Sequence, residues 1–283
     1  MTFAPILPLG GVAGFRLLEA TETAQRATFE RQPIIARDVT YFLEKISEVR
    51  TADDLVNDRR LLRVALGAFG LDEEIDKKAF IKKIVAEGTE SDEAFANRFV
   101  DPRYGRFADA FGFGNIGGAR TGLTGFAQSI TSAYTERQFE IAVGEGDETM
   151  RLALNFRREI REYAAASDPS GTAWFSVMGD VPVRRVFEGA FGLPESFGQL
   201  DIDRQRDELR SFNNRTFGSE SLDIFSDETK VDEVIGRFLA RAAAEAGPSA
   251  GTPGFTALSL LNGSGGIGSA GLANILLSSA RLG

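Results

Sequence analysis

A nine-residue segment that occurs twice places the strongest constraint on the fold of this chain. Residues 63–71 read RVALGAFGL and residues 185–193 read RVFEGAFGL, so seven of the nine positions are identical at an offset of 122. The match extends in the same order to residues 99–102 and 225–228, where a phenylalanine is followed two positions later by an aspartate. Order kept over such a length indicates an internal duplication. Two copies are too few for a solenoid, so we expect two related helical bundles, packed together or fused into one.

The segments around the repeat read as amphipathic helices. Between residues 33 and 49, apolar side chains recur at the i, i+3, i+4 and i+7 spacing of one helix face, at Val39, Phe42, Leu43 and Ile46. The helix around Phe42 is matched with the helix around Phe156, at an offset of 114. No segment shows the alternation of a β-strand, so the sequence predicts an all-α protein. Helices are expected at about 12–30, 33–49, 51–70, 75–87, 124–143, 147–166, 172–178, 180–191, 201–212 and 229–246, with further starts at Ser91 and Asp101.

Polar caps and glycines mark the boundaries of these helices. Thr51, with an acid three positions later, has the pattern of a capping box, and Asp101 before Pro102 is a second cap. Gly70 and Gly192 follow the repeated aromatic residue and are predicted to end their helices in the left-handed conformation. The aromatic residue beside each glycine, Phe69 or Phe191, is predicted to be a core anchor rather than part of a binding site.

The ends of the chain differ in composition from its body. The first residues are rich in Pro and Gly, and Gly, Ser, Pro and Thr dominate after Gly247. Such composition is typical of extended or flexible segments. The predicted organisation is a flexible N-terminal arm at 1–12, a first helical repeat unit at 13–118, a second at 119–246 and a Gly/Ser-rich tail at 247–283.

Composition removes several kinds of chemistry. The chain has no cysteine and no histidine, which excludes disulfides, thiolate metal sites, cysteine nucleophiles and every catalytic arrangement that uses histidine as the base. The net charge of −9 disfavours nucleic acid and anionic membrane surfaces as partners. No stretch approaches the roughly 18 apolar residues that a membrane span needs, and no secretory signal is visible. We expect no membrane insertion, and a location in the cytoplasm or export without a cleaved signal.

The motifs that resemble ligand sites have simpler interpretations. The GxGxxG pattern at 112–117 follows a helix rather than a strand, and too little chain follows the one at 263–268 for a βαβ unit. The acidic clusters at 72–76 and 145–148 lack the spacing of a calcium loop and fall where helices are expected to begin. We therefore predict no cofactor, no metal site and no catalytic residue.

Basic residues are scattered among acids. The pairs Arg157-Arg158 and Lys82-Lys83 each lie beside acidic residues, which is typical of a solvated helix face of mixed charge. Neither pair is interpreted as a phosphate-binding patch.

The two ends of the chain carry the candidate partner-binding residues. A loosely structured end with apolar side chains can fold against a partner, or it can pack back on its own domain, and both alternatives stay open here. The candidates are Phe3, Ile6, Leu7 and Leu9 in the arm and Leu272, Ile275, Leu276 and Leu277 in the tail.

Three long blocks carry a resemblance to a known family. They are RTADDLVNDRRLLRVALGAFGL at 50–71, EGTESDEAFANRFVDPRYGRFADAFGFG at 87–114 and WFSVMGDVPVRRVFEGAFGLP at 174–194. Together they resemble the bacterial domain-of-unknown-function family numbered 1217, over residues 5 to 243 and without the tail. The resemblance implies a place among flagellar genes of alphaproteobacteria, and it implies no catalytic residues.

Three functions follow as hypotheses. The first is a non-enzymatic flagellum-associated protein that binds other flagellar components in a structural, assembly or export-accessory role. The second is a cytoplasmic protein-binding adaptor or regulator unrelated to flagella. The third, more remote, is a hydrolase that works with paired carboxylates, which a cleft with two facing acids would favour. The sequence leaves the oligomeric state open.

Overall fold

The computed structural model describes residues 3–166 and 171–247, which contain helices and no strands, so the all-α prediction is confirmed. Residues up to Ala242 form one compact unit, and a second unit begins at Ala243. The helices are α1 (Gly11–Glu30), α2 (Pro33–Lys45), α3 (Ala52–Asn57), α4 (Arg59–Gly67), α5 (Lys78–Glu87), α6 (Pro102–Phe111), α7 (Phe126–Gly146), α8 (Glu148–Ala165), α9 (Ala173–Gly179), α10 (Val181–Phe191), α11 (Ile202–Phe217) and α12 (Glu228–Ala246). The tail candidates Leu272, Ile275, Leu276 and Leu277 lie outside the described residues.

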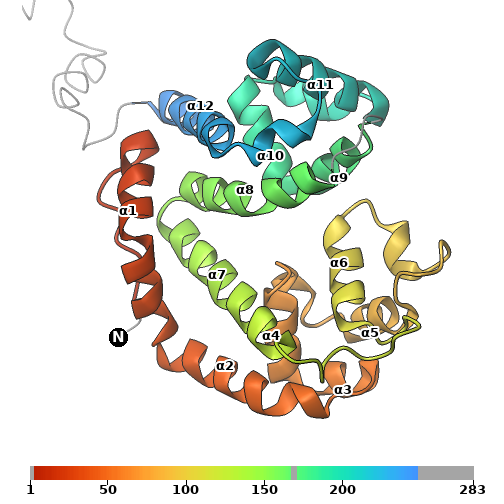
Figure 1. The fold of residues 1–283 in the computed structure, drawn as a ribbon. Helices are drawn as coiled ribbons and strands as arrows, with labels where there is room; N and C mark the ends of the chain where they lie inside the picture. The colour runs from red at the N-terminus through yellow and green to blue at the C-terminus, as the bar shows by residue number, and fades with distance from the viewer. Residues whose placement is uncertain (1–2, 167–170, 248–283) are drawn as a thin grey trace, which may run out of the picture. The chain divides into compact units, whose positions relative to one another are not determined.

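Within the first unit, α7 and α8 occupy the middle (Figure 1). The two helices pack against each other; α7 also packs on α2 and α4, and α8 packs on α10. The Gly-rich segment at 112–125 is the loop that leads into α7. As a result, α7 and α8 connect the first and second halves of the chain.

Local capping explains most helix starts. Thr51 and Asp54 form the predicted capping box at α3, and Asp101 accepts a hydrogen bond from the backbone N–H of Arg103 at the start of α6. The predicted helix over 51–70 is instead divided into α3 and α4. Its division lies at Asp58, whose carboxylate accepts hydrogen bonds from the N–H groups of Arg60 and Leu61 and so begins a new helix.

The helix predicted to begin at Ser91 is wrong. The chain makes only a short 3₁₀ turn there, η3 (Phe95–Arg98). The Glu87 carboxylate accepts the N–H of Phe95 at 2.7 Å, and the Asn97 amide donates to the carbonyls of Thr89 and Ser91 at 2.9 Å. Because side chains satisfy these backbone groups, the segment forms a turn rather than an α-helix.

The duplication is visible in the order of the elements and in matching hydrogen bonds. Helices α2, α3 and α4 are followed in the second half by α8, α9 and α10 at nearly the same spacing. Tyr41 donates to Asp58 at 2.6 Å, and Tyr163, 122 positions later, donates to Asp180 at 2.9 Å. Each aspartate also caps the helix that carries the repeated segment. The helices of Phe42 and Phe156, α2 and α8, thus correspond, but the register of these hydrogen bonds aligns Phe42 with Ala164 rather than with Phe156.

The repeated glycines also have matching surroundings. Gly70 and Gly192 adopt φ of +69° and +66°, as predicted for glycines at the end of a helix. The earlier glycine of each copy lies against an aromatic ring. A Cβ on Gly67 would lie 2.8 Å from Tyr134 on α7, and a Cβ on Gly189 would lie 2.6 Å from Phe238 on α12. Both positions are occupied by glycine because a side chain from another helix packs directly against each of them.

Gly67→Ala and Gly189→Ala should each lower the free energy of unfolding by about 1–3 kcal/mol, because the added methyl group overlaps a ring held in the core. Gly105→Ala is the matched control, since this helical glycine has nothing within 4 Å of the added Cβ. Helix propensity should make the control stabilising, by up to about 1 kcal/mol. Urea unfolding of the three variants tests this; equal effects at all three positions would contradict it.

Candidate functional site

The N-terminal arm, residues 3–10, lies on α1, and its apolar side chains are divided between the core and solvent. Phe3 and Leu7 are partly buried and pack against the hydrophobic core. Ile6 and Leu9 face solvent, with 65% and 54% of their surface exposed. The structure thus separates the four arm candidates into two anchors and two exposed residues.

Two buried glutamines hold the arm in place. The Gln25 carbonyl oxygen accepts the N–H of Ile6 at 2.7 Å, and its amide donates back to the Ile6 carbonyl at 3.3 Å. The Gln32 carbonyl oxygen accepts the N–H of Phe3 at 3.2 Å. Buried side-chain amides need such partners, so these bonds fix the backbone of the arm as well as satisfy the glutamines.

A network of buried charges joins α6, α7 and α8. At its centre is Glu159, with 1% of its surface exposed. Its carboxylate binds Arg106 from α6 and Arg137 from α7, each at 2.5 Å, and Arg158 from α8. Arg158 also makes two bonds to Glu140, at 2.8 and 2.9 Å. Three guanidinium groups therefore share two buried carboxylates.

The network controls the ionisation of its members. Burial disfavours the charged form of Glu159, but Arg137, Arg158 and Arg106 outweigh it and lower the pKa of this carboxyl to about 2. Asp180 shows the opposite balance: burial, with Glu159 nearby, raises its pKa despite the hydrogen bond from Tyr163. Glu159 thus remains ionised at neutral pH.

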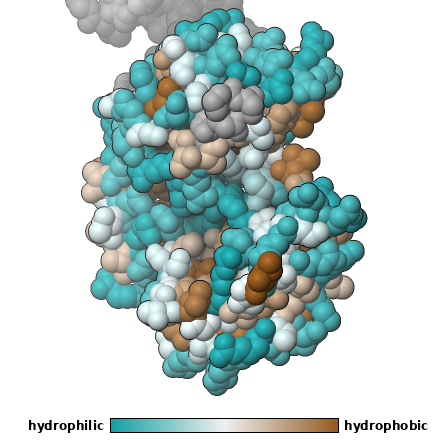
Figure 2. All heavy atoms as spheres, turned by 45° about the vertical axis from the view of Figure 1, so that its right-hand side comes forward, coloured by the Kyte–Doolittle hydropathy of each residue, from teal (hydrophilic) through white to brown (hydrophobic). Residues whose placement is uncertain are grey.

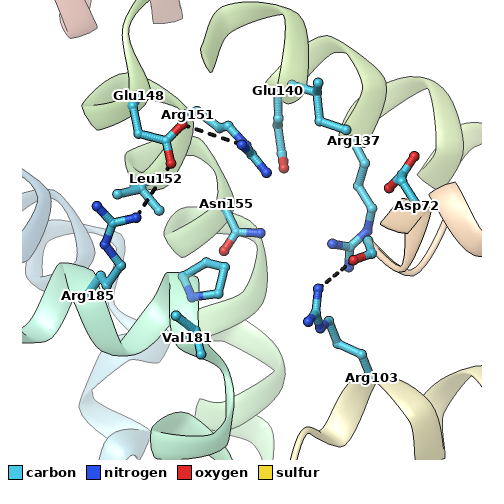
Figure 3. Close-up of a pocket in the computed structure, with 13 residues that line it drawn as sticks. Asp72, Arg103, Arg137, Glu140, Glu148, Arg151, Leu152, Asn155, Val181 and Arg185 are labelled. Atoms are coloured by element: carbon cyan, nitrogen blue, oxygen red, sulfur yellow. Dashed lines mark hydrogen bonds and ion pairs between the residues drawn. The ribbon is translucent and has the colours of Figure 1, made fainter. Parts of the chain in front are cut away.

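A polar pocket of about 210 Å³ opens next to this network. Figure 3 shows guanidinium groups on several sides of it, with Asn155 between them. The pocket is lined from α7 and α8, from the start of α10, from Arg103 on α6 and from the turn after α4. Its arginines are Arg103, Arg137, Arg151 and Arg185, and its acids are Asp72, Glu140 and Glu148.

The ion pairs in the pocket differ in closeness. Arg151 and Arg185 lie 3.4 and 3.6 Å from the same carboxylate, Glu148. Arg103 is held by Asp101 at 2.7 Å and donates to the carbonyl of Gly70. The outer arginines are therefore loosely held, and the inner ones are fixed.

The sequence did not indicate these residues. Arg158, interpreted as part of a solvated face, is mostly buried against Glu140 and Glu159, so that interpretation is wrong for this residue. Lys82 and Lys83 are exposed, as expected. Arg158 lies next to acids in the sequence just as the lysines do, so local charge pattern carried no signal that separated them.

The surface around these features is mainly polar. On the face drawn in Figure 2, hydrophobic residues form small, separate groups among hydrophilic ones. Among the described residues, no helix has the length and apolar character needed to cross a membrane. The same part of the chain contains no group of three or more acidic side chains placed to hold a metal ion.

Comparison with known proteins gives two matches. A family model described as "Protein of unknown function (DUF1217)" matches residues 68–231. The crystal structure of protein AGR_C_984 from Agrobacterium tumefaciens is similar over 87% of this chain and all of that one, with 26% identity and a TM-score of 0.70. A search of curated proteins finds no match.

Proposed function

Since the chain belongs to the DUF1217 family of proteins of unknown function, we propose that it is a non-enzymatic protein that binds other flagellar components. Its role would be structural, or in assembly or export. The observation that carries this proposal is the arm, which holds Ile6 and Leu9 exposed on a backbone fixed by Gln25 and Gln32.

A fixed arm is a favourable binding element. Apolar side chains that are already ordered lose little conformational freedom when a partner covers them. Large side chains that enter a partner's pocket contribute a disproportionate share of binding energy. Phe3 and Leu7 help to hold the arm in this position, because both side chains pack against the hydrophobic core.

The non-enzymatic part of the proposal rests on the ion pairs made by the acidic residues of the pocket. Glu140 is held by Arg158, and Glu148 faces Arg151 and Arg185. Because their oxygens are engaged by guanidinium groups, these acids do not form the free pair of facing carboxylates that a glycosidase-like hydrolase uses. The flagellar part rests on the family resemblance and on the setting that it implies.

The test is an affinity pull-down from native lysate with the full chain and with an Ile6→Ser/Leu9→Ser variant. We expect the wild-type chain to recover flagellar proteins and the variant to lose roughly tenfold or more of them, the effect of removing two central apolar contacts. An Ile34→Ser/Val100→Ser variant is the control, because those two side chains are similarly exposed at other sites.

Each outcome has a defined meaning. Equal recovery by the arm variant would show that Ile6 and Leu9 are not the contact. Recovery of proteins from outside the flagellum would favour the adaptor hypothesis. Normal swimming and filament assembly in a strain that lacks the gene would contradict the flagellar role.

A further inference from the structure

The pocket beside the charge network has no part in the proposed partner binding, and its composition is unusual. Four of its lining residues are arginines, which come from α6, α7, α8 and α10. Arginine presents a planar set of donors that matches the oxygens of carboxylate and phosphate groups. Arginines that converge on one small space from four helices are suited to an oxyanion.

The pocket's arginines have fewer carboxylate partners than they can use. Arg151 and Arg185 share Glu148, at distances longer than a close ion pair. On the inner side, Arg137 shares Glu159 with two other arginines. A guanidinium offers five donors, so both sides of the pocket retain donors for an added anion.

The electrostatic state of Arg137 supports this conclusion. Its burial, together with the positive charge of Arg158, lowers the pKa of this guanidinium even though Glu159 and Glu140 oppose the shift. A bound anion would add negative charge beside Arg137 and so favour its charged form.

Whereas the arginines offer donors to a ligand, Asn155 offers an acceptor. Asn155 lines the pocket, and its side-chain oxygen, among the atoms that the structure describes, is buried without a hydrogen-bond partner. A buried acceptor left unpaired is unfavourable, so a donor on a ligand would be stabilising there.

We propose that this pocket binds a small oxyanion, a phosphate or a carboxylate, that also carries a hydroxyl donor. The arginines receive the charged oxygens and the Asn155 oxygen accepts the hydroxyl. The volume of about 210 Å³ is below the range of roughly 300–1,000 Å³ typical of drug-sized ligands, which limits the ligand to a few atoms beyond the anionic group. The proposal is independent of the partner-binding role of the arm.

Isothermal titration of the full chain with inorganic phosphate and with sulfate tests the proposal near neutral pH. The two ions have similar shape, but hydrogenphosphate carries a hydroxyl donor and sulfate does not. We expect saturable phosphate binding that is at least several-fold tighter than sulfate binding. Titration with malate, a hydroxy-carboxylate, identifies the source: tighter binding of malate points to an organic acid, and tighter binding of phosphate points to a phosphate compound.

Variants locate the site. Arg151→Gln/Arg185→Gln should weaken phosphate binding at least tenfold, whereas Arg59→Gln/Arg161→Gln, which removes two similarly exposed and ion-paired arginines elsewhere, should leave it unchanged. Asn155→Leu should abolish the preference for phosphate over sulfate. Thermal unfolding of each variant confirms that it is folded. The proposal is overturned if neither phosphate nor malate binds saturably, or if the control variant loses as much affinity as the pocket variant.

Discussion

Replacing Glu159 by Gln should be among the most destabilising single substitutions in the protein. The carboxylate is buried and holds Arg106, Arg137 and Arg158 together. Without it, these guanidinium groups remain largely buried with too little negative charge nearby. Removing one partner from a buried ion pair typically costs about 3–5 kcal/mol. For a protein of this size, such a loss lowers the unfolding temperature by roughly 10 °C.

Glu162→Gln is the matched control. Glu162 also binds Arg106 at 2.5 Å and lies on the same helix, but 60% of its side chain is exposed. Exposed ion pairs contribute about 0–1 kcal/mol, so the control should unfold almost as the wild type does. Thermal and urea unfolding measure both variants, and equal losses would show that burial of the Glu159 network does not determine its contribution.

The wild-type protein and the Glu159→Gln variant should become more similar in stability at low pH. The pKa of Glu159 is about 2 in the folded protein, below the value of about 4.3 for an unfolded chain. A lowered pKa means that the stabilisation is complete above the unfolded value and is lost as pH falls toward the folded one. The difference between wild type and Glu159→Gln should therefore be largest near neutral pH and shrink between about pH 5 and pH 2.

Phe187→Ala is the second substitution with a large expected effect. Phe187 has no exposed surface, and its ring contacts Phe156, Trp174 and Phe225 with centroids 5.0, 5.3 and 5.5 Å away. Truncating a buried phenylalanine to alanine costs about 3–5 kcal/mol, because transfer energy is lost and a cavity remains. Urea unfolding should show this loss as a lower midpoint with an unchanged slope.

Two other variants bracket this result. Phe187→Leu retains most of the volume and should cost clearly less than the alanine variant. Phe212→Ala removes a ring of the same size that is only partly buried at the edge of the same cluster, stacked on Phe191 at 5.8 Å. A loss of stability at Phe212 as large as that at Phe187 would show that Phe187 is not the centre of this aromatic cluster.

The comparison of the two copies shows where sequence similarity stops. Position 187 is a phenylalanine at the centre of an aromatic cluster, and the matching position in the first copy, Ala65, is equally buried. The glycines at 67 and 189 are conserved between the copies because a helix packs over each one. The helix that does so is α7 in the first copy and α12 in the second, which no local pattern could have indicated.

The arm illustrates a similar limit for the candidate site. Four apolar residues near the N-terminus were predicted as partner contacts, without distinction among them. The division into inward Phe3 and Leu7 and outward Ile6 and Leu9 depends on hydrogen bonds that the arm's backbone donates to Gln25 and Gln32. Gln25 lies 19 positions after Ile6 and Gln32 lies 29 positions after Phe3, so the spacing within the arm did not contain the information.

Local chemistry was sufficient for the helical class, the duplication and the caps at Thr51 and Asp101, because helical periodicity and capping act between residues three or four positions apart. It was not sufficient for the break at Asp58, since the apolar pattern continues on both sides of it. The burial of Glu159 and the convergence of arginines on one pocket were decided by the tertiary structure alone. Each depends on α6, α7, α8 and α10 meeting in space, and whether a charged side chain is solvated or buried is set by its neighbours in the fold rather than by its neighbours in the sequence.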